Sequence, residues 1–346
     1  MLTNRSARLN EALNIVSNKK LVHGAIARVD TGDFSWSGAA GNLSLQTPFF
    51  IASTTKLYVT ACFFILKNQG TLSLDKMIGK YLDATILHGL HLYRGKDFSR
   101  AITVAHLLSQ TSGLPDYFMG KEPGRKPLLE DIEAGRDRHW SFDETIEVAK
   151  KIGPAFAPGE KTKALYSDTN FQILGKILEA QLNKPLATIF DELIFKPLKL
   201  NSTYLYCDPG DTKPASLYFK NDMLKIPRAM SSFQADGGIV STVDELMIFL
   251  KAFFQGTLFK AGDVKQMMKF RRIFFPLEYG VGISRFKLPR IFSPFKPTPE
   301  FIGHSGLSGA FAFYCPGREA WFTGTVNQVH KPGISFKLML QLLNSL

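Results

Sequence analysis

This sequence lacks several patterns that are typical of metal sites, phosphate-binding sites and α/β-hydrolases. It has only three cysteines in 346 residues, which cannot all pair, and none shows the Cys-x-x-Cys spacing of a zinc site. It has no Gly-rich phosphate-binding loop and no Gly-x-Ser-x-Gly nucleophile elbow, because the nearest match, at 303–307, ends in Leu307. We therefore expect no metal and no cofactor, and an α/β-hydrolase is disfavoured.

Long apolar runs are also missing. No run approaches the roughly 18 residues that span a bilayer. The first residues, Met1 to Ser6, lack the apolar region of a signal peptide. Instead, Leu9, Leu13 and Val16 recur at helical spacing and predict a surface helix. We expect a globular chain that is cytoplasmic as given, or exported to the periplasm if a leader was removed.

Acidic residues are outnumbered by basic ones, 30 to 42, which gives a net charge of +12. The densest basic stretch, Lys269 to Lys296, is interleaved with phenylalanines. It could face an anionic membrane or attract acidic substrates. We favour edge strands with the phenylalanines turned inward. No nucleic-acid motif accompanies the charge, so we expect a small-molecule or peptide substrate and no nucleic acid. The oligomeric state is left open.

A serine and a lysine one helical turn apart are the main candidates for catalysis. Ser53 and Lys56 stand at the start of a predicted helix, Thr54 to Lys67, which is ended by Gly70. Residues three apart share a helix face, so Lys56 can reach the Ser53 hydroxyl and take its proton. Desolvation and the positive end of the helix dipole both favour a neutral, basic Lys56.

The Ser-x-x-Lys spacing alone has little weight, because it occurs five times. The other four serines precede a solvated helix end, a loop or a proline-rich segment: Ser17, Ser73, Ser284 and Ser293. Only Ser53 opens a long helix, and its simplest alternative role is that of a helix N-cap.

Two further motifs follow Ser53 along the chain. Tyr-Ser-Asp at 166–168 leads into an apolar helix, and His-Ser-Gly at 304–306 precedes an alternating strand. In this order the three motifs resemble the serine β-lactamase and penicillin-binding-protein superfamily. Within it, the chain is most similar to the branch of class C β-lactamases, D-alanyl-D-alanine carboxypeptidases and esterases. The similarity spans roughly residues 20 to 340 and includes three connecting segments: Ile102–Pro115, Pro158–Glu160 and Gly237–Thr242.

The resemblance implies the catalytic roles. Ser53 would be acylated, and Lys56 and Tyr166 would transfer its proton to the leaving group. The backbone N–H groups of Ser53 and Leu307 would form the oxyanion hole. For Tyr166 to act as a base, its pKa must fall far below about 10, which requires a nearby cation such as Lys56.

Substrate binding is implied for Asp168, His304, Ser305 and Gly306. His304 stands where β-lactamases often carry lysine, and it would donate to a substrate carboxylate or to Tyr166, with full charge only below about pH 6.5. Asp168 replaces the more familiar Asn, and an ionised Asp suits contact with Lys56 or a substrate ammonium. Gly306 would let a strand edge approach the substrate. These departures favour a peptidase or esterase over a dedicated β-lactamase.

The implied fold is an α+β, β-lactamase/transpeptidase-like fold. We assign residues 1–52 and 225–346 to a discontinuous α/β lobe, an antiparallel sheet flanked by helices, and residues 53–224 to an inserted, mainly helical lobe. Ser53 would lie in the cleft between them. The expected sheet strands and closing helix are Leu21–Val29, Phe34–Ala39, Ala310–Tyr314, Ala320–Val326 and Ile334–Leu346.

These features predict a serine hydrolase that acts through an acyl-enzyme on an ester, amide or peptide, with carboxypeptidase, esterase or β-lactamase activity. Two alternatives remain. The first is a D-amino-acid peptidase or amidase that recognises a substrate amine through Asp168. The second is a non-catalytic, penicillin-binding-like sensor that binds ligands without turnover.

Overall fold

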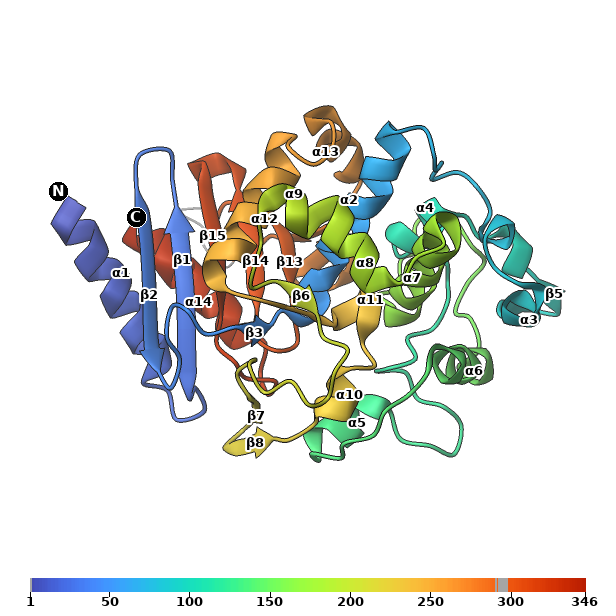
Figure 1. Cartoon of the computed structure of the whole chain (residues 1–346), viewed down its shortest axis with the longest axis horizontal. Coiled ribbons are helices and arrows are strands. Elements are labelled where there is room, and N and C mark those ends of the chain that lie inside the picture. The colour runs from blue at the N-terminus through green and yellow to red at the C-terminus, as the bar shows by residue number, and fades with distance from the viewer. Residues whose placement is uncertain (1, 290, 292–297) are drawn as a thin grey trace.

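An eight-stranded antiparallel sheet organises one half of the computed structural model, which describes residues 2–289, 291 and 298–346 (Figure 1). In spatial order its strands are β10 (Arg271–Phe274), β11 (Leu277–Tyr279), β12 (Ser284–Phe286), β13 (Phe301–Ser305), β14 (Phe311–Cys315), β15 (Ala320–Thr325), β1 (Gly24–Asp30) and β2 (Ser35–Gly41). Strand β1 pairs with β15 on one side and with β2 on the other, so Ala27 lies opposite Gly324 of β15 and Gly38 of β2. The two ends of the chain therefore share one sheet.

Helices cover both faces of this sheet. Helix α1 (Leu2–Ser17) and helix α14 (Gly333–Ser345) pack against each other on one face. The predicted N-terminal stripe is buried there, since Leu9, Leu13 and Val16 are at most 2% exposed. Helix α12 (Val243–Gln255) packs on strands β15, β1 and β14 from the other side. Side chains that point to either face of the sheet can therefore be buried.

The second half of the molecule is mainly helical and is built around α2 (Thr55–Asn68) and α7 (Asp168–Leu182), which pack together. Its shorter segments, and those that join it to the sheet, are η1 (Ala52–Thr54), η2 (Ile78–Lys80), α3 (Ala84–Leu87), η3 (Ser99–Ala101), α4 (Val104–Leu108), α5 (Leu128–Glu133), α6 (Phe142–Ile152), α8 (Leu186–Phe190), the π-helical η4 (Asp191–Phe195), α9 (Lys196–Leu198), α10 (Pro227–Met230), α11 (Gln234–Gly237), α13 (Ala261–Met267) and η6 (Pro316–Arg318). Small sheets are formed by β3 (Phe49–Phe50), β9 (Ile239–Ser241) and β6 (Tyr204–Leu205), by β4 (Leu92–Tyr93) and β5 (Lys96–Asp97), and by β7 (Leu217–Phe219) and β8 (Asp222–Leu224).

The fold class predicted from the sequence is confirmed, and most of the element limits differ from it by one or two residues. Strand β1 begins three residues later than Leu21, because the Val22 N–H donates to the Lys19 carbonyl and keeps this segment in a turn. Strands β14 and β15 and helix α14 form where they were expected. The division into lobes at residues 52/53 and 224/225 stays a prediction.

The basic, phenylalanine-rich stretch forms the outer strands β10 to β12, as expected, but its phenylalanines do not all face inward. Phe286 is buried, whereas Phe274 and Phe275 are 52% and 53% exposed. The β10–β11 register shifts between Arg272 and Phe274, and such an irregularity changes which side chains face the core. The predicted part of this stretch at 290 and 292–297 lies outside the described residues.

Candidate active site

Ser53 and Lys56 are joined as their spacing predicts. Ser53 lies in the short 3-10 turn η1, directly before α2, and Lys56 lies in the first turn of that helix. The Lys56 Nζ atom donates to Ser53 Oγ over 3.2 Å. Ala52, just before the serine, has a φ of 44°, a left-handed conformation that strains a residue with a Cβ. The surrounding structure therefore holds the serine in one orientation.

The charge of Lys56 differs from the prediction. Its side chain is fully buried, yet Nζ lies 2.7 Å from Asp168 Oδ1 and donates to the Asp236 carbonyl over 2.6 Å. Burial alone would lower the pKa of Lys56, but Asp168 and then Asp236 outweigh it, so the pKa is raised. The expected neutral base is wrong for the free protein, because an ion pair replaces the lost hydration.

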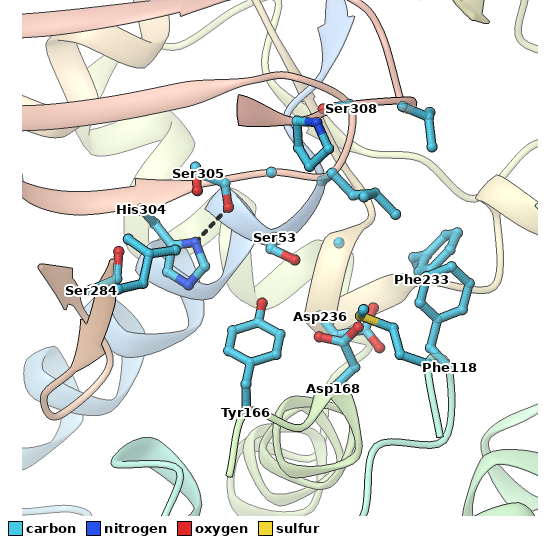
Figure 2. A pocket seen from close by; sticks show the side chains of 18 of the residues that line it. Ser53, Phe118, Tyr166, Asp168, Phe233, Asp236, Ser284, His304, Ser305 and Ser308 are labelled. Atoms are coloured by element: carbon cyan, nitrogen blue, oxygen red, sulfur yellow. Dashed lines mark hydrogen bonds between the residues drawn. The ribbon is translucent and has the colours of Figure 1, made fainter. Parts of the chain in front are cut away.

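Tyr166 precedes α7 and directs its hydroxyl at Ser53 (Figure 2). Its ring lies under the Lys56 ammonium, with Nζ 5.2 Å from the ring centroid. The low pKa that Tyr166 would need to act as a base is not found in the free protein. Burial and then the Asp168 carboxylate raise the pKa of Tyr166 well above its usual value, although a hydrogen bond with Ser53 opposes this. The Asp168 carboxylate therefore neutralises the charge of the Lys56 ammonium and at the same time disfavours ionisation of the Tyr166 hydroxyl.

Asp168 begins α7 and faces both Lys56 and the cavity, with 6% of the residue exposed. The contact of Asp168 with Lys56 that the residue types suggested is therefore present. Because Lys56 already neutralises this carboxylate, Asp168 has less charge to offer a substrate ammonium than its position in the sequence suggested.

His304 lies on β13 and is held as a neutral ring. Its Nδ1 lies 2.8 Å from the Ser305 carbonyl, and a carbonyl can only accept, so Nδ1 carries the hydrogen. Burial and then Lys56 lower the pKa of His304 to about 3. The expected donation to Tyr166 or to a substrate carboxylate is wrong, because the Nδ1 hydrogen is used inside the strand and Nε2 is left as an acceptor.

The oxyanion-hole candidates lie where η1 meets the end of β13. No backbone acceptor is found among the described residues for the N–H of Ser53 or of Leu307. A Cβ on Gly306 would come within 2.4 Å of the Ile51 carbonyl oxygen. Glycine is therefore needed at 306 for contact between strand and turn, and its role in the approach to a substrate stays a prediction.

A cavity of about 280 Å³ opens above Ser53. Every candidate site residue from the sequence lines it except Lys56, which is buried beneath it. Its remaining wall is largely apolar and contains Phe118, Met119, Phe233, Phe274 and Tyr279. Ser305 lies in the wall beside His304 (Figure 2). The site can therefore accommodate an apolar group next to a reacting carbonyl.

Sequence reasoning missed the buried acids around Lys56. Asp236 is 1% exposed and lines the cavity, and Asp116 is 9% exposed. Burial and then Asp168 raise the pKa of Asp116 to about 8. The Tyr117 hydroxyl donates to Asp236 across 119 positions of the sequence, so no local spacing could have indicated the pair.

Other expectations concern absences. Among the residues that the structure covers, no cluster of His, Cys, Asp and Glu could hold a metal ion. Within the same residues, no helix is both long and apolar enough to cross a membrane. Cys62, Cys207 and Cys315 are all unpaired, and Cys62 lies in the core.

Known proteins resemble this chain over most of its length. A family model described as Beta-lactamase matches residues 14–339. A D-stereospecific amidohydrolase from Streptomyces sp. is 24% identical and superposes with a TM-score of 0.78, over 96% of this chain and 97% of that one. At this identity, the superposition establishes the fold alone.

Two curated proteins are also similar. A Salmonella paratyphi A protein named as a D-alanyl-D-alanine carboxypeptidase is 23% identical over 322 residues, 83% of this chain and 71% of that protein. An N-acetylmuramyl-L-alanine amidase of Bacillus subtilis is 33% identical over 162 residues, 46% of this chain. This chain therefore matches only about a third of the amidase's length, 34%.

Proposed function

Since the chain belongs to the β-lactamase family, we propose that it is a serine hydrolase that cleaves an ester, amide or peptide through an acyl-enzyme on Ser53. One observation carries the proposal: Ser53 Oγ lies 3.2 Å from Lys56 Nζ, with the Tyr166 hydroxyl directed at it, at the edge of an apolar cavity (Figure 2). A nucleophile flanked by two proton-transfer groups is the arrangement that acyl transfer requires.

The reaction begins when Ser53 Oγ attacks the substrate carbonyl. The developing oxyanion accepts hydrogen bonds from the N–H groups of Ser53 and Leu307. The serine proton passes through Lys56 and Tyr166 to the leaving group, and water then hydrolyses the acyl-enzyme by the reverse route. Because the pKa values of Lys56 and Tyr166 are both raised, the active form has lost one proton from this cluster, and turnover rises with pH.

The charges around the cavity favour a neutral or cationic substrate. Lys56 is paired with Asp168, and His304 has a pKa of about 3, so neither is a free cation near neutral pH. A carboxypeptidase or β-lactamase has to hold a substrate carboxylate, which this wall does not assist. Esters and amides with an apolar acyl group that carries no carboxylate fit it better.

A second candidate within the same chemistry is a peptidase or amidase for D-amino-acid derivatives. The carboxyl group of Asp236 in the wall favours a substrate that carries an amine, whereas the Asp168 carboxylate is paired with Lys56. The Streptomyces fold neighbour is named a D-stereospecific amidohydrolase.

Ester hydrolysis and intact mass test the proposal together. Ser53→Ala should lower kcat on a p-nitrophenyl ester by at least about a thousandfold, and it should abolish an acyl adduct seen on the wild type. Ser73→Ala, at another Ser-x-x-Lys, is the matched control and should retain activity. Equal hydrolysis by the wild type and Ser53→Ala would refute the proposal. Binding without turnover or adduct would favour the non-catalytic sensor instead.

A further inference from the structure

Asp236 contributes an unusual carboxyl group to the cavity wall. It lies in α11, is 1% exposed, and stands beside Asp168 at the foot of the cavity (Figure 2). Its main-chain carbonyl accepts from Lys56, but none of the mechanistic steps above uses its side chain.

The two oxygens of this carboxyl group have different surroundings. Oδ2 accepts from the Tyr117 hydroxyl over 2.8 Å and from Gln172 Nε2 over 3.1 Å. Oδ1 is buried and has no hydrogen-bond partner among the described residues. A buried oxygen without a partner is costly, so Oδ1 is the position where an incoming donor would be most stabilising.

The charges that face Asp236 favour a cationic donor. Helix α7 contributes Asp168, helix α2 contributes Lys56, the loop before α5 contributes Tyr117, and the segment before α7 contributes Tyr166. Burial and then Asp168 raise the pKa of Asp236 well above its usual range, and Lys56 only partly opposes them. The charged carboxylate is therefore disfavoured in the free protein, and a cation at Oδ1 would stabilise it.

We propose that Asp236 Oδ1 is the acceptor for the protonated amino group of the substrate, which makes amine-bearing amides or esters with an apolar side chain the preferred substrate class. The inference rests on the proposed function, and it assigns amine recognition to Asp236 rather than to Asp168, whose charge Lys56 neutralises. On binding, the ammonium group keeps its protons and pairs with the ionised Asp236 carboxylate, and the proton that Asp236 carries in the neutral form leaves to solvent.

Two ligands that differ by a single amine test this assignment. Phenylalaninamide and 3-phenylpropanamide share the aromatic group and the amide, and only the first has an amino group. Calorimetric titration of the Ser53→Ala protein measures binding without turnover. At about pH 6, where an α-amino group is almost fully protonated, buffers of different ionisation enthalpy report the protons released.

With Asp236 intact, we expect phenylalaninamide to bind about tenfold to a hundredfold more tightly than 3-phenylpropanamide. Because the raised pKa of Asp236 favours its neutral form in the free protein, binding of the ammonium should release protons rather than take them up, and affinity should rise with pH. In the Ser53→Ala, Asp236→Asn protein the release should vanish and the preference should fall at least about tenfold. The Asn side chain can still accept from Tyr117 and Gln172, so the packing is retained.

Three results would overturn the proposal. The two ligands could bind equally well, or proton release could persist in the Asp236→Asn protein. The preference for the amine could also survive Asp236→Asn and be lost with Asp168→Asn. The exposed Asp244→Asn, which alters a surface pair with Arg28, is the matched control and should leave binding unchanged. If Asp236→Asn does not fold, Tyr117→Phe removes a donor to Oδ2 and should weaken amine binding in the same direction. Amine binding by a protein whose wild type never turns over would instead refute the hydrolase while retaining this subsite.

Discussion

Replacing Asp168 with asparagine should make the protein active at lower pH. The wild-type carboxylate lies 2.7 Å from Lys56 Nζ and raises the pKa of the lysine. Two unit charges at that separation attract by about 6 kcal/mol at an effective dielectric constant of about 20. Asparagine has nearly the same shape and removes this attraction, while the burial that disfavours the ammonium form remains.

The direction of the pH shift follows from the negative charge that the substitution removes. Without Asp168 the protonated form of Lys56 loses its main partner, so neutral lysine forms at lower pH. Tyr166 also loses the carboxylate that raises its pKa, which acts in the same direction. A neighbouring opposite charge typically moves a titration by about 1 to 3 pH units, so the acid limb of the rate profile should move down by that amount.

The assay is the pH dependence of kcat and kcat/KM on an uncharged p-nitrophenyl ester, with Asp168→Asn beside the wild type. We expect the variant to be at least about tenfold faster in the acidic range, with the alkaline plateaus within a few fold of each other. Asp244→Asn, on the surface, controls for the change in net charge. An acid limb that stays in place or moves to higher pH would show that Asp168 does not control the base, and the reasoning would be refuted.

Two further predictions concern neighbouring residues of the site. Gly306→Ala would place a Cβ 2.4 Å from the Ile51 carbonyl oxygen and displace the oxyanion-hole segment, so steady-state kinetics should show kcat reduced about a hundredfold to a thousandfold with KM less affected. His304 has a folded pKa of about 3, so below about pH 6.5 the unfolded chain binds the extra proton and stability falls by up to about 1.4 kcal/mol per pH unit. Urea unfolding should show a flatter acid dependence for His304→Asn, whose amide can still donate to the Ser305 carbonyl; an unchanged slope would contradict a buried neutral histidine.

The parts of the fold that local patterns control were predictable. Alternating apolar residues indicated strands β14 and β15, and the helical stripe of Leu9, Leu13 and Val16 indicated α1. The outward Phe274 was not predictable, because a register shift in β10 depends on its partner strand.

For the candidate site, the sequence by itself determined which groups could meet by helix pitch and motif order. Ser53 and Lys56 lie on one helical turn, and the Tyr-x-Asp and His-x-Gly motifs join them in a fold that the family shares. The first property depends on a spacing of three residues and the second on the order of motifs, and the sequence contains both directly.

Only the tertiary structure decided the charge state of the site. Lys56 remains an ammonium because α7 brings Asp168 against it, and because Asp236, 180 positions away, supplies a carbonyl. His304 is neutral because the surrounding layers bury it near that ammonium. Protonation depends on burial and on the distance to every nearby charge, and those quantities exist only once segments far apart in the chain have packed together.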